Sequence, residues 1–314
     1  MSRKTFLRFA APAAAVLAAS ALAGCGSTAK SGSPLAQQAS SGSVVVGSDN
    51  FAESVLLADI YGQALAGKGI KVSYKLDIGS REVTYGLVKS GSITLKPEYN
   101  GALLSYLDKT AAQTSTSEVD AAITSHLAAG LEILTPSTAQ DNDTLTLSKQ
   151  EAATLGLAQG ATISQFITKL AGKPIVIGGS PEFQTRTQGV LGLEQDYGLK
   201  ASQITYKTLD AGGPLTEKAL TSNEVNAGDL FTTDPTISQG GLLTLVDDKN
   251  IFGVQDVLPL ISKAGLNQTG IDALNAVDAK LDSAALLKLD TDVQVQKQDP
   301  LTVANQWLTS VGLS

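Results

Sequence analysis

From residue 44 onward, short runs of β-branched residues alternate with longer stretches in which apolar residues recur at helical spacing. The strand-like runs are residues 44–48, 72–76 and 93–95, and the helical stretches between them are residues 50–65 and 82–89. This order predicts a β-α-β-α-β unit with a parallel sheet that is covered by helices on both faces. Ligands of such sheets collect at the carboxyl ends of the strands.

The same alternation starts again near Asp143 and predicts a second α/β unit. Residues 242–246 predict a strand that crosses back to the first unit, and residues 258–313 are helical in character. The elements expected in the second unit are a helix at 163–170 and strands at 175–177 and 204–209, after which residues 225–231 lead to the segment 232–235.

Two crossings of the chain predict an α/β protein of two lobes. The first lobe is expected from residues 44–137 together with 240–314, and the second from residues 138–239. Such lobes close on a ligand by a hinge motion in which few residues change conformation.

The segment Leu95-Lys96-Pro97-Glu98-Tyr99-Asn100-Gly101 is expected to end the third strand in a rigid turn. Pro97 fixes its own φ and favours an extended Lys96, and Gly101 permits a close backbone approach. Tyr99 is therefore a candidate binding residue, and an ordinary strand-to-helix connection is the alternative.

The chain begins with the features of a secretory leader, namely basic residues followed by an apolar run that is too short for a membrane span. Residues 1–24 are interpreted as a signal peptide that ends just before Cys25, the only cysteine. This start resembles a bacterial lipoprotein signal, which implies lipidation of Cys25. Residues 25–43 are rich in Ser, Gly, Ala and Gln and predict a flexible tether, so the body is expected outside the cytoplasm, anchored to the cell membrane.

Charge and composition argue against several classes of function. The chain has 23 basic and 30 acidic residues, for a net charge of -7, and this balance argues against a nucleic-acid partner. His126 is the only histidine, so a histidine-dependent triad or a metal site lacks residues, and no metal or cofactor is expected. An enzyme is therefore disfavoured, although a glycosidase-type pair of carboxylates stays open.

Five short motifs occur in one order along the body. They are Val45-Val46-Gly47-Ser48-Asp49-Asn50-Phe51-Ala52-Glu53, Gly79-Ser80-Arg81-Glu82-Val83, Pro97-Glu98-Tyr99-Asn100-Gly101, the segment from Pro181-Glu182-Phe183 to Arg186, and Thr232-Thr233-Asp234-Pro235. Together they resemble the substrate-binding proteins of osmoprotectant ABC importers, which take up glycine betaine, choline and carnitine. The resemblance implies a type II periplasmic-binding-protein-like fold of two α/β lobes with a two-stranded hinge. It also implies a small-molecule ligand, an ABC permease with its ATPase as partner, and a monomer.

The resemblance also implies roles for individual residues. Aromatic rings hold a quaternary ammonium in this family, and Tyr99 and Phe231 match two of them. Arg186 matches the arginine that holds the ligand carboxylate. The remaining candidate ligand-binding residues are Asn50, Phe51, Ser80, Lys96, Asp143 and Thr232.

Three positions depart from the family pattern. Leu145 and Gln255 stand where aromatic rings are expected, and Lys96 places a cation where an apolar or aromatic residue is usual. Betaine binding is therefore expected to be weaker than in an intact four-ring site. Two alternatives stay open: a binding protein for a different small polar solute, and a sensory or structural surface lipoprotein that kept the fold without transport.

Overall fold

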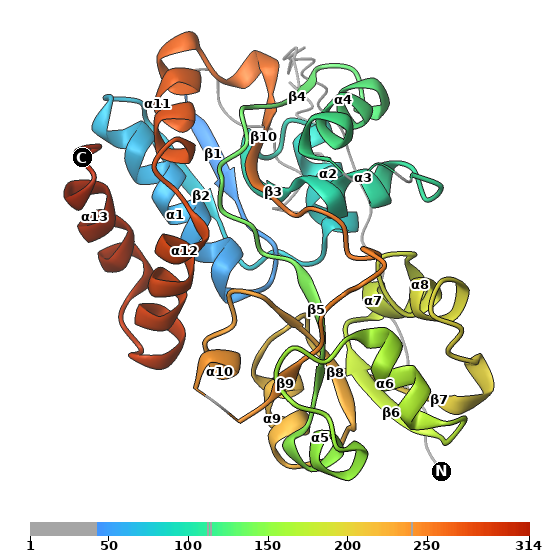
Figure 1. Cartoon of the computed structure of the whole chain (residues 1–314). Helices are drawn as coiled ribbons and strands as arrows, with labels where there is room; N and C mark the ends of the chain where they lie inside the picture. The colour runs from blue at the N-terminus through green and yellow to red at the C-terminus, as the bar shows by residue number, and fades with distance from the viewer. Residues whose placement is uncertain (1–42, 112, 114, 240) are drawn as a thin grey trace, which may run out of the picture.

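The computed structural model describes residues 43–111, 113, 115–239 and 241–314. These residues form two five-stranded sheets, each covered by helices, in two lobes that lie side by side (Figure 1). The expectations for residues 1–24, for the tether and for Cys25 lie outside the described residues.

The first sheet has the strand order β2-β1-β3-β10-β4, and β1, β2 and β3 are parallel while β10 runs antiparallel to β3 and β4. Its inner strands are buried on both faces because helices cover both sides. Its strands are β1 (Val44–Gly47), β2 (Val72–Lys75), β3 (Leu95–Tyr99), β4 (Leu131–Ile133) and β10 (Val257–Ser262).

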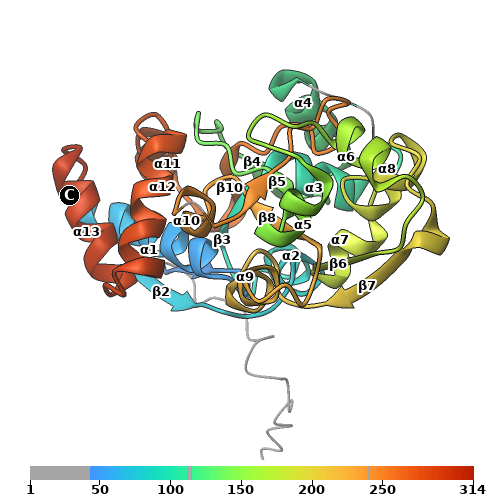
Figure 2. The same ribbon diagram turned by 60° about the horizontal axis from the view of Figure 1, so that its bottom comes forward.

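Two groups of helices cover the first sheet. In both views α11, α12 and α13 lie beside α1 on one side of the first lobe (Figures 1 and 2). The helical segments of this lobe are α1 (Ala52–Gly67), α2 (Arg81–Lys89), α3 (Asn100–Leu107), α4 (Thr116–His126), η3 (Lys263–Gly265), α11 (Gln268–Asp278), α12 (Ser283–Asp290), η4 (Thr291–Val295) and α13 (Pro300–Ser310).

The second sheet has the order β7-β6-β8-β5-β9, so it repeats the arrangement of the first sheet, with an antiparallel strand beside the third strand of the parallel unit. Its strands are β5 (Asp143–Leu147), β6 (Ile175–Gly179), β7 (Ile204–Thr208), β8 (Ala227–Phe231) and β9 (Leu243–Thr244). Its helical segments are α5 (Lys149–Leu155), α6 (Ile163–Leu170), α7 (Pro181–Thr185), α8 (Val190–Gln195), η2 (Ala201–Gln203), α9 (Pro214–Thr221) and α10 (Pro235–Ser238).

Two chain segments connect the lobes and pair with each other. Gln140 and Asp256 form an antiparallel bridge. The Asp141 N–H donates to the Gln255 carbonyl at 3.1 Å, and the Val257 N–H donates to the Ala139 carbonyl at 3.0 Å. This pair of strands is the hinge of the two-lobed α/β fold that the sequence predicts.

The prediction that residues 242–246 cross back to the first lobe is wrong. Leu243 and Thr244 pair with β5 in the second sheet, and Leu245 and Phe252 belong to the second lobe's core. The return crossing comes later, at β10, so the boundary predicted at residues 239 and 240 lies too early. Both stretches are short apolar runs, and their pattern does not say which sheet each joins.

Two other local predictions are also wrong. The region expected to be helical from residue 258 begins with the strand β10 instead. This strand lies inside the sheet and is buried on both faces, so its sequence lacks the alternation that would have indicated a strand. The expected turn at Pro97 is part of β3. Pro97 lies directly opposite Pro259, so the two residues without an N–H group share one position of the ladder.

Candidate ligand-binding site

A cavity of about 90 Å³ lies between the lobes, at the carboxyl ends of strands from both sheets. A second space of about 620 Å³ adjoins it and shares Phe51, Asp141 and Phe231, so the room between the lobes extends beyond this cavity. Of the nine predicted ligand-binding residues, the structure places seven in its wall: Asn50, Phe51, Ser80, Tyr99, Asp143, Arg186 and Phe231.

Three aromatic rings from different strand ends meet at this cavity. Phe51 is the residue before α1, Tyr99 is the last residue of β3, and Phe231 is the last residue of β8. The ring centroid of Phe51 lies 6.1 Å from that of Tyr99 and 6.1 Å from that of Phe231. Because Phe231 comes from the second lobe, the aromatic group depends on the two lobes being close together.

Glycine is required at residue 212, where the backbone passes the Phe231 ring. Gly212 has φ of +59°, and an added Cβ would lie 2.4 Å from the Phe231 Cδ2 atom. Any other residue would therefore displace the ring and strain the backbone.

Arg186 is held at the cavity wall by groups of its own lobe. One of its terminal nitrogens forms an ion pair with the Asp143 carboxylate, and its Nε donates to the Gln188 carbonyl at 3.2 Å. The resemblance implies that Arg186 binds the carboxylate of the ligand. In the structure Arg186 is paired with the Asp143 carboxylate of the protein instead.

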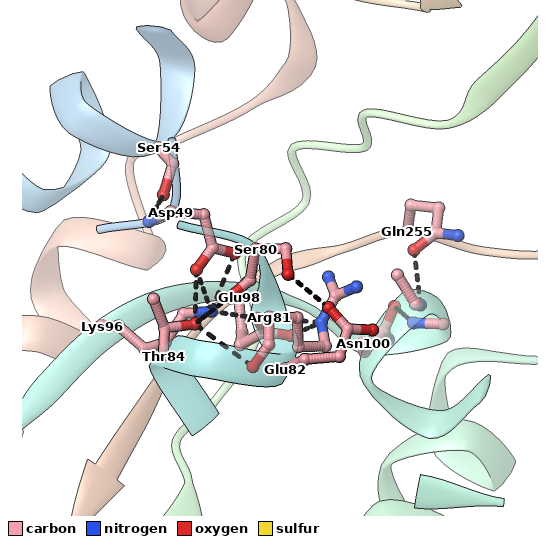
Figure 3. A network of polar contacts seen from close by, with 12 residues as sticks. Asp49, Ser54, Ser80, Arg81, Glu82, Thr84, Lys96, Glu98, Asn100 and Gln255 are labelled. Carbon is pink, nitrogen blue, oxygen red and sulfur yellow. Dashed lines mark hydrogen bonds and ion pairs between the residues drawn. The ribbon is translucent and has the colours of Figure 1, made fainter. Parts of the chain in front are cut away.

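Lys96 does not line the cavity, contrary to the prediction. Its side chain is fully buried, and Nζ lies 2.7 Å from Asp49 Oδ1 and 2.6 Å from Glu98 Oε1 (Figure 3). Nζ also donates to the Thr84 hydroxyl at 3.0 Å. Two carboxylates therefore neutralise the ammonium beneath the site, and the expected repulsion of a cationic ligand does not arise from it.

The same network holds Arg81, which does line the cavity. Its Nε donates to Glu98 at 2.9 Å (Figure 3). Each of the two basic side chains of this network thus has an acidic partner, and the network supports the strand ends that carry Phe51 and Tyr99.

Thr232 was predicted to bind the ligand, but the threonine that lies between the lobes is its neighbour, Thr233. Thr232 is exposed, its hydroxyl accepts a hydrogen bond from the Asn142 N–H, and it is not among the residues of the cavity wall. Thr233 is buried instead, and its hydroxyl lies 2.8 Å from Glu53 Oε2 and 2.7 Å from Asp141 Oδ1. This contact joins the second lobe to α1 of the first lobe and to the hinge.

Three buried acids of the wall were not predicted as ligand-binding residues. Asp49 follows β1 and is paired with Lys96, Asp141 lies in the hinge segment, and Asp229 lies inside β8. The only signal in the sequence is an acidic residue within the otherwise small and apolar run 227–231, where a charge is costly unless it has a function.

Leu145 and Gln255 occupy the places where the family pattern suggests rings. Leu145 is fully buried opposite Asp229 in the β5–β8 ladder and is not part of the wall. Gln255 lines the cavity, and its Oε1 accepts a hydrogen bond from the Ala102 N–H at 2.8 Å. Neither offers a ring to an ammonium.

Within the described residues, no cluster of His, Cys, Asp or Glu side chains is suited to hold a metal ion. The search of those same residues also finds no helix with the length and apolar character needed to cross a membrane.

Residues 42–310 match the model of the substrate-binding domain of ABC-type glycine betaine transport systems. The chain belongs to this family. The prediction of the family from the five motifs is thereby confirmed, and the family description is that of a binding domain in a transport system, not of an enzyme.

Individual proteins support this assignment over most of the chain. The glycine betaine-binding protein YehZ of Escherichia coli is 29% identical over 86% of this chain and 90% of its own length. A glycine-betaine-binding protein of Pseudomonas aeruginosa is 25% identical over 84% of this chain and 86% of its own. A solved structure of a glycine betaine/carnitine/choline ABC transporter has a TM-score of 0.68 at 17% identity. The match covers 86% of this chain and 99% of that one, and it shows that the two share a fold.

Proposed function

We propose that this protein captures a small quaternary-amine osmoprotectant of the betaine or choline class between its lobes and delivers it to an ABC permease with its ATPase. The observation that carries the proposal is the group of three rings, Phe51, Tyr99 and Phe231, in the wall of one small cavity. A quaternary ammonium has no hydrogen to donate, so the faces of aromatic rings are its main source of attraction.

Closure of the lobes is part of this proposal. Phe51 and Tyr99 belong to the first lobe and Phe231 to the second, so a ligand in contact with all three favours the closed arrangement. A permease that recognises the closed form would receive only the loaded protein.

Removing one ring should weaken choline binding. Phe231→Leu keeps an apolar side chain but removes the π face, and a loss of about 1 to 2 kcal/mol of binding free energy is expected for a desolvated contact. Tyr99→Ala should weaken binding by a similar amount, although it also removes the hydrogen bond to Glu53. Titration calorimetry with choline measures both losses.

Tyr106→Ala is the matched control, because Tyr106 packs against Tyr85 with ring centroids 5.2 Å apart and lies outside the cavity wall. Its choline affinity should equal that of the wild type. Tight choline binding that neither Phe231→Leu nor Tyr99→Ala changes would refute this site.

We also propose that the body is held at the outer face of the cell membrane by a lipidated Cys25. The apolar run before Cys25 and the tether composition of residues 25–43 support this anchor. Cys25→Ser should therefore move the protein from the membrane fraction to the soluble extracytoplasmic fraction or the medium. Immunoblots of the fractions check it, and an unchanged membrane share in the variant would contradict the anchor.

A further inference from the structure

Asp229 is a buried acid in the cavity wall that accepts no hydrogen bond from the described residues, although Asp143 and Arg186 lie close to it. Its exposed fraction is 1%, and neither of its carboxylate oxygens has a hydrogen-bond partner in the part of the chain that the structure describes. A buried carboxylate that receives no hydrogen bond is costly, because its interaction with water has been lost without replacement.

The side chains that face Asp229 are already committed to other groups. Arg186 is paired with Asp143, and the Tyr206 hydroxyl donates to the Ser180 carbonyl at 2.6 Å. Asp141 is itself an acid and accepts from Thr233. The opposite side of Asp229 packs on Gly179, where an added Cβ would lie 2.9 Å from the Asp229 Cβ atom.

In the first-lobe part of the wall each charged side chain named here has a partner of opposite charge, whereas acids are in excess in the second-lobe part. In the first lobe Asp49 is paired with Lys96, and Arg81 is paired with Glu98. In the second lobe Arg186 faces both Asp143 and Asp229, and Glu182 adds a further acid to the wall. The second-lobe side of the cavity therefore has more acceptors than donors.

We propose that Asp229 selects ligands whose polar end donates a hydrogen bond, such as the hydroxyl of choline, over ligands that end in a carboxylate, such as glycine betaine. This inference rests on the proposed binding of a quaternary ammonium at the aromatic rings. A donor would satisfy Asp229, whereas a carboxylate would face Asp143 and Asp229 and would have to compete for Arg186.

The position of Asp229 fits a small bifunctional ligand. It lies two residues before Phe231 in β8, on the same face of the strand, which corresponds to a separation of about 7 Å along the strand. A ligand with its ammonium at the Phe231 ring therefore reaches Asp229 with its other end.

Protonation of Asp229 gives a second signature. Burial and the neighbouring Asp143 carboxylate raise the pKa of Asp229 well above its usual range, with Arg186 opposing. The empty site therefore favours a proton on Asp229, and a hydroxyl donor needs the ionised carboxylate, so choline affinity should rise with pH in the wild type. In Asp229→Asn this pH dependence should be reduced.

The test compares choline, glycine betaine and tetramethylammonium by titration calorimetry on the wild type and Asp229→Asn. Tetramethylammonium has the cationic head alone, so the ratio of choline to tetramethylammonium affinity isolates the hydroxyl. At the alkaline end of the pH range, where the ionised form of Asp229 is more populated, choline should bind to the wild type more tightly than either of the other two. Asp229→Asn should reduce the advantage of choline over both by about tenfold or more, because a hydrogen bond to a charged acceptor is lost.

Asp278→Asn is the matched control. Asp278 is also a buried acid with one unpartnered oxygen, but it ends α11 in the first lobe, accepts from the Tyr61 hydroxyl at 2.8 Å and lies outside this cavity wall, so the affinity ratios should not change. A wild type that prefers glycine betaine to choline, or ratios that Asp229→Asn leaves within about twofold, would overturn the assignment of Asp229. If tetramethylammonium binding then still depends on Phe231, the proposed function stands. If none of the three compounds binds, both proposals fail.

Discussion

Replacing Lys96 with methionine is expected to lower the free energy of unfolding by about 3 to 5 kcal/mol. The Lys96 ammonium is fully buried and forms hydrogen bonds to Asp49 at 2.7 and 2.8 Å and to Glu98 at 2.6 Å. Methionine has a similar length but no charge, so two buried carboxylates would be left with less compensation. Urea unfolding followed by circular dichroism measures the change.

Lys288→Met is the control for the loss of a lysine charge as such. Lys288 pairs with Asp292 at 2.6 Å, but its side chain is 75% exposed, so its removal should cost at most about 1 kcal/mol. If Lys96→Met were no more destabilising than Lys288→Met, the buried network of Figure 3 would not contribute to the stability of the first lobe.

The sequence alone could not show this role of Lys96. The family resemblance places Lys96 among the ligand-binding residues, and alternation along β3 does not reveal which acids face it. Its partner Asp49 is 47 positions away in the sequence. Long-range ion pairs of this kind depend on how the strands are ordered in the sheet.

The architecture was predictable where hydrophobic periodicity is strong. The helix at 163–170 and the strands expected at 44–48, 72–76, 175–177 and 204–209 occur where the sequence places them, whereas β3 lies later than the expected 93–95. The errors at residues 242–246 and at β10 have one cause: a short apolar run indicates a buried element but not the sheet that it joins or, in the case of β10, even its type.

The candidate site was predictable where residues follow strand ends. Phe51, Tyr99 and Phe231 each stand at such a position, and parallel strands place these ends together. Asp141 and Asp229 were missed because one lies in the hinge and the other inside a strand, where polarity alone does not show that a side chain faces a cavity.

The protein is expected to be more stable at mildly acidic pH than at pH 8, because several buried acids meet between the lobes. Burial, with Asp290 nearby, raises the pKa of Glu53 well above its usual range, and hydrogen bonds from Tyr99 and Thr233 oppose this shift. Burial raises the pKa of Asp290 to about 7, from 3.8, with a further contribution from Asp141. Asp141 is itself buried, and its pKa is also raised.

The sign follows from proton binding in the two states. Between pH 4 and 7 the folded protein keeps a proton on Asp290 that the unfolded chain has released, so the folded state binds more protons. Its stabilising contribution is fully present below about pH 4 and is lost as the pH rises through about 7. A shift of this size corresponds to about 4 kcal/mol across the window.

Asp290→Asn should flatten this dependence, since an amide stays neutral at every pH and can still bind Gln294, which donates to Asp290 at 3.1 Å. Urea unfolding at pH 5, 6, 7 and 8 should show a smaller loss of stability in the variant than in the wild type. Asp272→Asn, at an exposed position of α11, should keep the wild-type profile. A wild type that gains stability steadily from pH 5 to 8 would show that Glu53, Asp141 and Asp290 are ionised in the folded protein at little cost.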